Sequence, residues 1–505
     1  MSILPHPLTP VPSPASPPPA RLLPPHARQR LALHARADTQ PISRLAHDHH
    51  VSRKFVYQQA DKAQQALDHA FAPEPPDGER VLFWLPVTKA WLQQLVLGLV
   101  LIGRCSLRGV IELLADLFDY SISLGSVQAI VQRAIPRARA ATARVPLAAV
   151  DLGAHDEIYQ ADVPVLVGVD VASTYCYLLS PEEHCDGETW GVRLLELRDR
   201  GFAPRATVAD GGTALRAGQA LALPGVPCRG DVFHALYELG QAVAVMDNRA
   251  YAAIDARARL ERKQASHKRR KGRKSRPVAG RLPHAGSAEA RAVALAEDVA
   301  TLARWLRQDV LAVAGPDLAT RQELYDFIVA ELQARQAGGP QTLRAACTAL
   351  ANGRDALLAF AAALDADLTA LAAAVAVPVA VLREVLAVQA LDERRGQRWR
   401  REAALRARLR GRYHRVRTAV AAVAGRVVRA SSVAENLNSR LRGYFQLWRQ
   451  VGAGSLALLQ FYLNHRRLPR SEWPDRVGKS PAELLTGEAH SHWLELLGYQ
   501  RFSRN

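Results

Sequence analysis

Residues 151–179, DLGAHDEIYQADVPVLVGVDVASTYCYLL, decide the fold of this chain. Strand-like runs at Val165–Val171 and Tyr175–Leu179 are bounded by turn residues, and a third run follows at Ala206–Ala209. Short, β-branched runs between turn residues are typical of strands that are at least half buried. We therefore expect a small sheet within residues 146–215.

Acidic residues lie within or at the ends of these strands: Asp156, Glu157, Asp170 and Asp210. A carboxylate at a strand end is held rigidly and can point into a shared cleft, as metal-dependent chemistry on phosphates requires. The sheet is therefore expected to carry a catalytic centre.

Asp156 and Asp170 cannot both line that centre. A four-residue turn between Gln160 and Val165 would place His155 opposite Asp170. Cross-strand partners share a face and successive residues alternate between faces, so Asp156 and Asp170 would point to opposite sides of the sheet. Either one remains a candidate on this argument alone.

Length and charge indicate several domains and a polyanionic partner. The chain has 505 residues and a formal net charge of +18. Residues 257–281 hold twelve Arg or Lys and one acid, and residues 394–417 hold eleven Arg and one acid. Such concentrated basic patches are typical of nucleic-acid binding.

The five cysteines form no CxxC pair, which fits a reducing cytosol and argues against structural zinc. The longest apolar run, Leu95–Ile102, is too short to span a bilayer, and no signal peptide is evident.

The sequence pattern divides the chain into seven regions. We expect a disordered Pro-rich tail (1–30), a helix-turn-helix DNA-binding domain (31–75), a helical domain that could be a second helix-turn-helix (80–145), the first part of a catalytic domain (146–245), a helical insertion with basic patches (246–430), the second part of the catalytic domain (431–468) and a C-terminal tail (469–505).

Residues 39–71 have the pattern of a helix-turn-helix. Ile42, Leu45 and Ala46 would form one apolar face, and Ser52 could cap a second helix that carries Phe55 and Val56 inward. The polar side chains of that helix would enter a major groove. A small helical pair with a polar outer face has the same pattern.

Three helical patterns follow, at Lys89–Gly103, Ser106–Phe118 and Gly125–Arg133. The middle one is expected to bury Val110, Leu113, Leu114 and Leu117.

The late stretch Ser431–Trp448, SSVAENLNSRLRGYFQLW, predicts an amphipathic helix. Its large apolar residues recur at spacings of three and four, which leaves Glu435 on a polar face with Asn438, Arg442 and Arg449. Arginines suit phosphate oxygens, so Glu435 is a candidate site residue rather than an ordinary solvated glutamate.

Asp231 and His234 are one helical turn apart and could reach a common ligand, or Asp231 could simply cap its helix.

The basic run His267–Arg276 is expected to be a flexible arm that contacts backbone phosphates. In residues 394–417, Trp399 and Tyr413 are interleaved with arginines, so stacking on an unpaired base is possible, as is a solvated helix face.

The ordered motifs DEIY (156–159), VADGG (208–212), DVFH (231–234) and SSVAENLNSRLR (431–442) resemble those of bacterial insertion-sequence transposases of the DDE class. The NHRR and GKSPAELL segments are similar to the tails of such enzymes, and the resemblance covers most of residues 40–490 outside the helical insertion. It implies an α+β, ribonuclease H-like domain whose mixed sheet is flanked by helices. It also favours Asp156 over Asp170.

By this resemblance Asp156, Asp210 and Glu435 would be the catalytic metal ligands for two Mg²⁺ or Mn²⁺ ions, with Asp170, Asp231 and His234 as secondary candidates. The expected function is cleavage at mobile-element ends and strand transfer into target DNA, by a homodimer or larger assembly in the bacterial cytosol. An inactive DNA-binding regulator or a ribonuclease H-like nuclease are the alternatives. The residues expected to contact DNA are Ser52, Arg53, Lys54, Tyr57, Gln58, Lys268, Arg269, Arg270, Lys271, Arg273, Lys274, Trp399, Arg400, Arg442 and Arg449.

Overall fold

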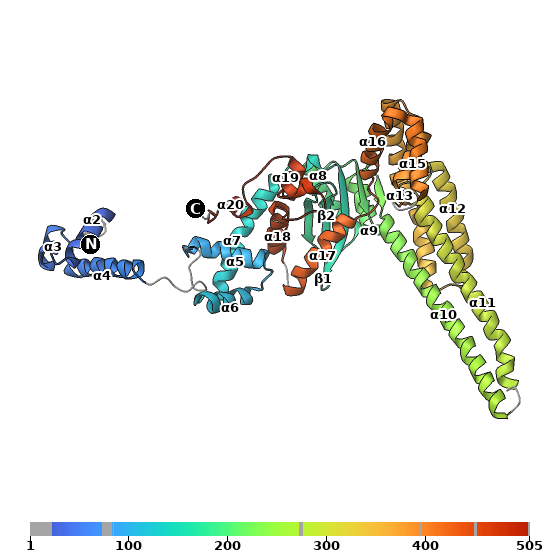
Figure 1. The fold of residues 1–505 in the computed structure, drawn as a ribbon, viewed down its shortest axis with the longest axis horizontal. Coiled ribbons are helices and arrows are strands. Elements are labelled where there is room, and N and C mark those ends of the chain that lie inside the picture. The colour runs from blue at the N-terminus through green and yellow to red at the C-terminus, as the bar shows by residue number, and fades with distance from the viewer. Residues whose placement is uncertain are drawn as a thin grey trace, which may run out of the picture. The chain divides into compact units, whose positions relative to one another are not determined.

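The computed structural model describes residues 23–72, 83, 85–271, 276–392, 396–448 and 452–502, without side-chain detail for 270, 271 and 276. The chain divides into two compact units, Met1–Pro86 and Val87–Asn505. Figure 1 shows both units and labels many of their elements; each unit is described by itself below.

The first unit contains helices α2 (Pro25–Arg36), α3 (Ile42–Asp48) and α4 (Arg53–Ala70). Leu31, Leu45, Ala46 and Val56 form its small buried core, so the apolar faces of α3 and α4 are as predicted. Helix α2 begins at Pro25, so residues 25–30 are helical and do not belong to the Pro-rich tail.

The second unit opens with α5 (Lys89–Leu101), α6 (Leu107–Phe118) and α7 (Leu124–Ala143). The Ser123 side chain caps α7, and the helix runs ten residues beyond the predicted end at Arg133. Val110 and Leu114 of α6 are buried, whereas Leu117 is 70% exposed, contrary to expectation. Helix α5 packs in one core with sheet residues, which explains why it is apolar nearly all round.

A five-stranded mixed sheet lies at the centre of this unit, in the order β3-β2-β1-β4-β5. Its strands are β1 (Leu152–Gln160), β2 (Val163–Asp170), β3 (Cys176–Pro181), β4 (Ala206–Ala209) and β5 (Cys228–Gly230). Strands β1, β2 and β3 form antiparallel pairs, and β4 runs parallel to both β1 and β5. The mixed α and β class is therefore as predicted.

The β1–β2 turn is tighter than predicted. Gln160 pairs with Val163, so only two residues form the turn, and Ala161 adopts the left-handed region at φ 52°. Asp156 consequently pairs with Val167 and Asp170 with Gly153. The predicted register was wrong by two residues. Because the error is even, Asp156 and Asp170 still point to opposite faces.

Helices cover both faces of the sheet. One face packs against α5–α7, α17 (Ser432–Leu447) and α18 (Ala453–His465). The other packs against α8 (Gly187–Asp199) and α9 (Thr213–Ala222), with Trp190, Tyr177 and Phe202 buried between them. Asp156 lies on the face of Ala154 and Ile158, which is the α17 face.

A block of helices separates β5 from α17. Its members are α10 (Val232–Lys271), α11 (Arg276–Trp305), a π-helical turn (Leu306–Val310), α12 (Leu318–Arg335), α13 (Gln341–Val375), α14 (Val379–Gln389), α15 (Gly396–Leu409) and α16 (Tyr413–Gly425). Helices of this block end or begin near Pro277, Gly338–Pro340 and Pro378. Figure 1 shows α10 and α11 side by side as a long hairpin.

The described part of the first basic stretch is helical, not a flexible arm. Residues 267–271 are the last turn of α10, and α11 begins at Arg276. Arg273 and Lys274 lie outside the described residues.

The C-terminal segment contains α19 (Pro481–Thr486) and α20 (Trp493–Leu496). Trp493 and Leu497 join the core beneath α7 and α18, so this segment packs as part of the second unit. Short 3₁₀ turns occur at Leu147–Ala149, Gln336–Gly338, Arg410–Arg412 and Pro474–Arg476. Among the described helices, α13 alone has the length and composition to cross a membrane, and it packs against α10, α12, α14 and α16.

Candidate active site

The register between β1 and β4 brings the first two predicted carboxylates together. Leu152 pairs with Ala206 and Ala154 with Val208, a constant offset of 54 residues. If that offset continues two residues past the paired segment, Asp156 is level with Asp210, directly after the end of β4. Asp210 also shapes its own turn, because its Oδ1 accepts a hydrogen bond of 2.9 Å from the Gly212 backbone N–H.

Asp156 is held from two sides. Its Oδ1 accepts a hydrogen bond of 2.9 Å from the Glu157 backbone N–H, and its Oδ2 accepts one of 2.8 Å from the Asn438 side-chain amide. Asn438 is 2% exposed and belongs to α17, which packs on β1 and β2. The hydrogen bond therefore fixes the position of α17 relative to the carboxylate.

Glu435 stands in the first turn of α17, one helical turn before Asn438. Its side chain is exposed, in line with the predicted polar face. Asn438 was assigned to that same face, but it is buried against the sheet. A spacing of three residues from Glu435 was the only sequence signal that could have identified it as a partner of the carboxylates.

Four carboxylates influence one another at this point. Burial is the main cause that raises the pKa of Asp156 to about 7, and the negative charges of Asp210, Glu157 and Glu435 raise it further. Burial and the charge of Asp210 likewise raise the pKa of Glu157. No Lys, Arg or His of the described residues forms an ion pair with any of the four. Asp156, Asp210 and Glu435 form the acidic cluster; Glu157 follows Asp156 on β1 and points to the opposite face of the sheet, but its charge is close enough to raise the pKa of Asp156.

The cluster has the donor chemistry of a magnesium or manganese site. All its charged donors are hard carboxylate oxygens, the ligands that Mg²⁺ prefers. The Asn438 Oδ1 is a buried oxygen without a hydrogen-bond partner, which adds an unsatisfied acceptor beside Asp156. Within the described residues no three Asp, Glu, His or Cys side chains are close enough together to hold an ion as they stand. The donor types fit such an ion, and its binding would require the carboxylate side chains to move closer together.

Asp170 is used by its own turn. Its Oδ2 accepts hydrogen bonds from the Ser173 backbone N–H at 2.7 Å and from the Ser173 hydroxyl at 2.5 Å. With its side chain on the face away from α17, it does not meet Asp156. Asp156 and Asp170 thus lie on opposite faces of the sheet, as the alternation along the strands predicted.

Asp231 caps α10 and also accepts hydrogen bonds from Ser431, the residue before α17. Its Oδ1 accepts a hydrogen bond of 2.9 Å from the His234 backbone N–H, and its Oδ2 accepts bonds from the Ser431 N–H (2.8 Å) and hydroxyl (2.5 Å). His234 bonds to Glu238 at 3.2 Å through its ring. A cavity of about 250 Å³ is lined by Asp231 and His234 together with Asp210. Both oxygens of Asp231 are engaged, so its role here is positioning.

The predicted DNA-contacting residues of the first unit lie on the surface of α4. The Ser52 hydroxyl caps this helix by accepting a hydrogen bond of 3.1 Å from the Phe55 N–H. The predicted contact residues beyond the cap are all exposed: Arg53, Lys54, Tyr57 and Gln58.

In the second unit the predicted DNA contacts differ in availability. Lys268, Arg269, Trp399, Arg400 and Arg442 are exposed. Tyr413 is 3% exposed, so it cannot stack on a base, contrary to the expectation from its spacing. Arg270 and Lys271 are helical without described side chains, and Arg449 lies outside the described residues.

The chain matches no protein-family model and no curated protein.

Proposed function

We propose that this protein is a DDE-type DNA transposase that cuts at the ends of a mobile element and joins them to target DNA. The observation that carries the proposal is the position of Asp156, a partly buried carboxylate that is level with Asp210 and hydrogen-bonded to Asn438, one helical turn after Glu435 on α17. None of the described Lys, Arg or His side chains forms an ion pair with Asp156, and the charges of Asp210, Glu157 and Glu435 add to burial in raising its pKa. Such an arrangement is unfavourable by itself and is typical of sites that bind metal ions or perform acid–base chemistry.

The architecture supports the same proposal. Asp156 and Asp210 stand on neighbouring parallel strands of a mixed sheet, and Glu435 stands on a helix that packs on one face of it. A mixed sheet covered by helices on both faces is what a ribonuclease H-like domain would have. The third carboxylate follows Asp210 by 225 residues in sequence, and the intervening helical block accounts for that distance.

Asp156, Asp210 and Glu435 would hold two Mg²⁺ or Mn²⁺ ions. Bound there, the ions would supply activation of a water or 3′-hydroxyl and stabilisation of the leaving oxygen. The chain's own residues provide the positioning: Asn438 orients the Asp156 carboxylate, and Asp231 fixes the start of α17 through Ser431. The exposed Arg442, two turns after Glu435 on the same helix, is suited to bind a DNA phosphate.

The remaining parts would bring DNA to this centre. The α3–α4 pair would act as a helix-turn-helix that reads the element ends, with the polar surface of α4 in the major groove. The basic residues at the end of α10 and the arginines of α15 would contact backbone phosphates. By the family resemblance the enzyme would work as a dimer or larger assembly in the bacterial cytosol.

The test is an assay of strand cleavage and joining on labelled DNA taken from either side of the gene, with Mg²⁺ or Mn²⁺. We expect Asp210→Asn and Glu435→Gln to lose activity by at least a hundredfold, whereas the exposed control Asp151→Asn keeps it. Full activity of both site variants would refute the proposed ligands. Cleavage without joining would identify a nuclease instead. DNA binding with no cleavage by the wild-type protein would identify a regulator.

A further inference from the structure

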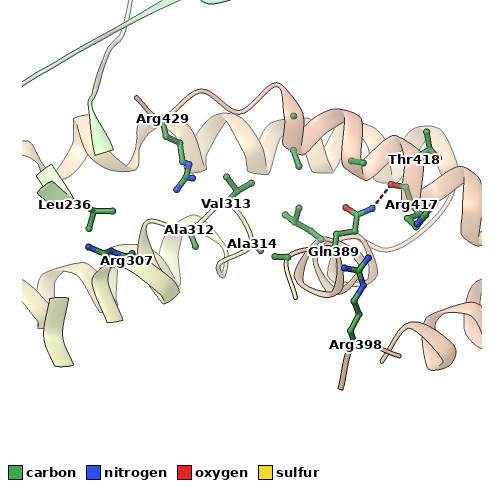
Figure 2. A pocket seen from close by; sticks show the side chains of 15 residues that line it. Leu236, Arg307, Ala312, Val313, Ala314, Gln389, Arg398, Arg417, Thr418 and Arg429 are labelled. Carbon is green, nitrogen blue, oxygen red and sulfur yellow. Dashed lines mark hydrogen bonds between the residues drawn. The ribbon is translucent and has the colours of Figure 1, made fainter. Parts of the chain in front are cut away.

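A second site lies in the helical block, away from the carboxylates. A cavity of about 900 Å³ opens between α10, the loop after the π-helical turn, α14, α15, α16 and the segment that leads into α17. Figure 2 shows arginine side chains around it, from Arg307, Arg398, Arg417 and Arg429. No Asp or Glu occurs among the described residues that line it.

One wall of this cavity is built around a buried arginine. Arg321 is 0% exposed and donates hydrogen bonds to the carbonyl oxygens of Ala312 (2.7 Å), Val313 (3.1 Å) and Pro316 (2.7 Å), as well as to that of Val310. These bonds hold the loop whose residues 312–314 line the cavity. Gly315 lies against the same guanidinium, so the loop has little room to rearrange. The wall is therefore fixed in place before any ligand arrives.

The positive charges of the cavity are only partly engaged by the protein. Arg429 is partly buried and donates to the Leu311 carbonyl oxygen, and burial lowers the pKa of its guanidinium. Arg398 donates to the Leu391 carbonyl oxygen at 3.0 Å. Arg307 and Arg417 are exposed at the rim. Figure 2 shows Arg307 and Arg429 at one end of the cavity and Arg398 and Arg417 at the other, so each end presents positive charge that would attract an anion.

The rest of the lining suits a flat, partly apolar group. Leu236, Val313 and Leu386 contribute apolar surface, and several alanines leave space beside them. Gln389 donates its amide N–H to the Arg417 carbonyl oxygen at 2.8 Å, as the dashed line in Figure 2 shows, so that its own carbonyl oxygen can accept a hydrogen bond. A few polar groups on an apolar surface of this volume are the usual features of a small-ligand site.

We propose that this cavity binds a nucleotide. The phosphate would lie against Arg307 and Arg429 at one end of the cavity, since guanidinium groups bind phosphate oxygens in bidentate fashion, and Arg417 would lie beside the base at the other end. The base would lie on the apolar wall with its edge toward Gln389. The nucleotide is either an unpaired residue of a DNA strand or a free nucleoside phosphate; both present the same chemistry. This site is independent of the metal chemistry proposed above.

The segment that holds Arg429 links the cavity to the carboxylates. The Arg429 carbonyl oxygen accepts a hydrogen bond of 2.7 Å from the Val232 N–H, and two residues later Ser431 is bound to Asp231. Helix α17 begins directly after Ser431. A nucleotide bound to Arg429 therefore contacts the segment that positions the helix of Glu435.

The test measures binding by the full chain in buffer with EDTA, so that loss of the metal chemistry cannot affect the result. The probes are deoxyadenosine monophosphate, inorganic phosphate and a 12-residue single-stranded DNA oligonucleotide. The variant is Arg307→Ala combined with Arg417→Ala, two exposed residues whose loss should leave the fold intact. The matched control is Arg304→Ala with Arg415→Ala, exposed arginines of the preceding helix α11 and of α16 that do not line the cavity.

We expect the site variant to bind the mononucleotide or the oligonucleotide at least tenfold more weakly than the wild type, with the control unchanged. Loss for the mononucleotide identifies a free nucleoside phosphate as ligand, and loss for the oligonucleotide alone identifies a DNA strand. In the second case the slope of log K against log salt should also fall by about 0.7 for each lost phosphate contact. Equal weakening by both double variants, no weakening by either, or equal affinity for inorganic phosphate and the mononucleotide would overturn the proposal.

Discussion

The substitution Asp156→Asn should stabilise the metal-free protein at alkaline pH. In the wild-type protein the folded-state pKa of Asp156 is raised to about 7, from 3.8 in the unfolded chain, so folding disfavours its charged form. The sign follows directly: a carboxyl group with a raised folded pKa destabilises the native state increasingly as pH rises from about 4 to about 7. Asparagine removes this charge and is nearly the same size. Its amide can donate to the Asn438 Oδ1, which has no partner in the wild-type protein.

The size of the effect follows from the two pKa values. Between pH 5 and pH 8 the destabilisation grows by about 2 pKa units, or about 3 kcal/mol if fully realised. Because Asp156 is only partly buried, solvent screening reduces this to about 1–2 kcal/mol. The stability advantage of the variant over the wild type should therefore be larger at pH 8 than at pH 5 by about that amount.

The measurement is thermal unfolding of both proteins in EDTA at pH 5 and pH 8, followed by a repeat at pH 8 with Mg²⁺. Magnesium should raise the melting temperature of the wild type more than that of the variant, since only the wild type has the full charge to be neutralised. A constant difference between the two proteins at both pH values would show that folding does not raise the pKa of Asp156, and the electrostatic reasoning about the site would fail.

Three further predictions address the residues around the carboxylates and the first unit. Asn438→Leu removes a hydrogen bond to charged Asp156 and should raise its pKa, so the pH for half-maximal metal-dependent cleavage should move upward; an unchanged pH profile would contradict this. Asp231→Asn leaves one of its hydrogen-bond donors without an acceptor, and it should reduce stability by about 1–3 kcal/mol in chemical unfolding; a neutral result would exclude a positioning role. Ser52→Ala removes the cap of α4 and should lower the stability of the first unit by about 0.5–2 kcal/mol, seen as weaker helical circular dichroism on heating.

The elements of this fold were predictable where local pattern determines structure. The runs at Val165–Val171 and Ala206–Ala209 became strands, and the serine at position 52 became a helix cap, because side-chain alternation and capping act over a few residues. The β1–β2 register was missed because Ala161 takes a left-handed conformation that alanine rarely adopts. The prediction that Asp156 and Asp170 diverge survived, since an error of two residues does not change the face of a strand.

Features that depend on distant contacts were beyond the sequence argument. Apart from its spacing of three residues from Glu435, nothing local distinguishes Asn438 from other polar residues of its helix, yet it is buried against Asp156. Leu117 was expected to be buried from its spacing, but the α5–α7 core closes without it. Burial of Tyr413 is also a tertiary effect: the packing of α13, α14 and α16 covers a ring that the arginine-rich sequence suggested was exposed.

The position of the helical block explains how such a long interruption can coexist with a site that needs Glu435 beside the sheet. The block leaves the sheet at Asp231 and returns at Ser431, 200 residues later, and these two residues are joined by two hydrogen bonds. A third bond, from the Val232 N–H to the Arg429 carbonyl oxygen, closes the same junction. The entropic cost of closing a loop grows only slowly with its length. The three bonds at the junction therefore offset nearly the same cost for a long insertion as for a short one. The start of α17 is thus fixed by residues at the base of the block, and helices farther out can carry a binding site of their own without displacing the carboxylate that α17 brings to the sheet.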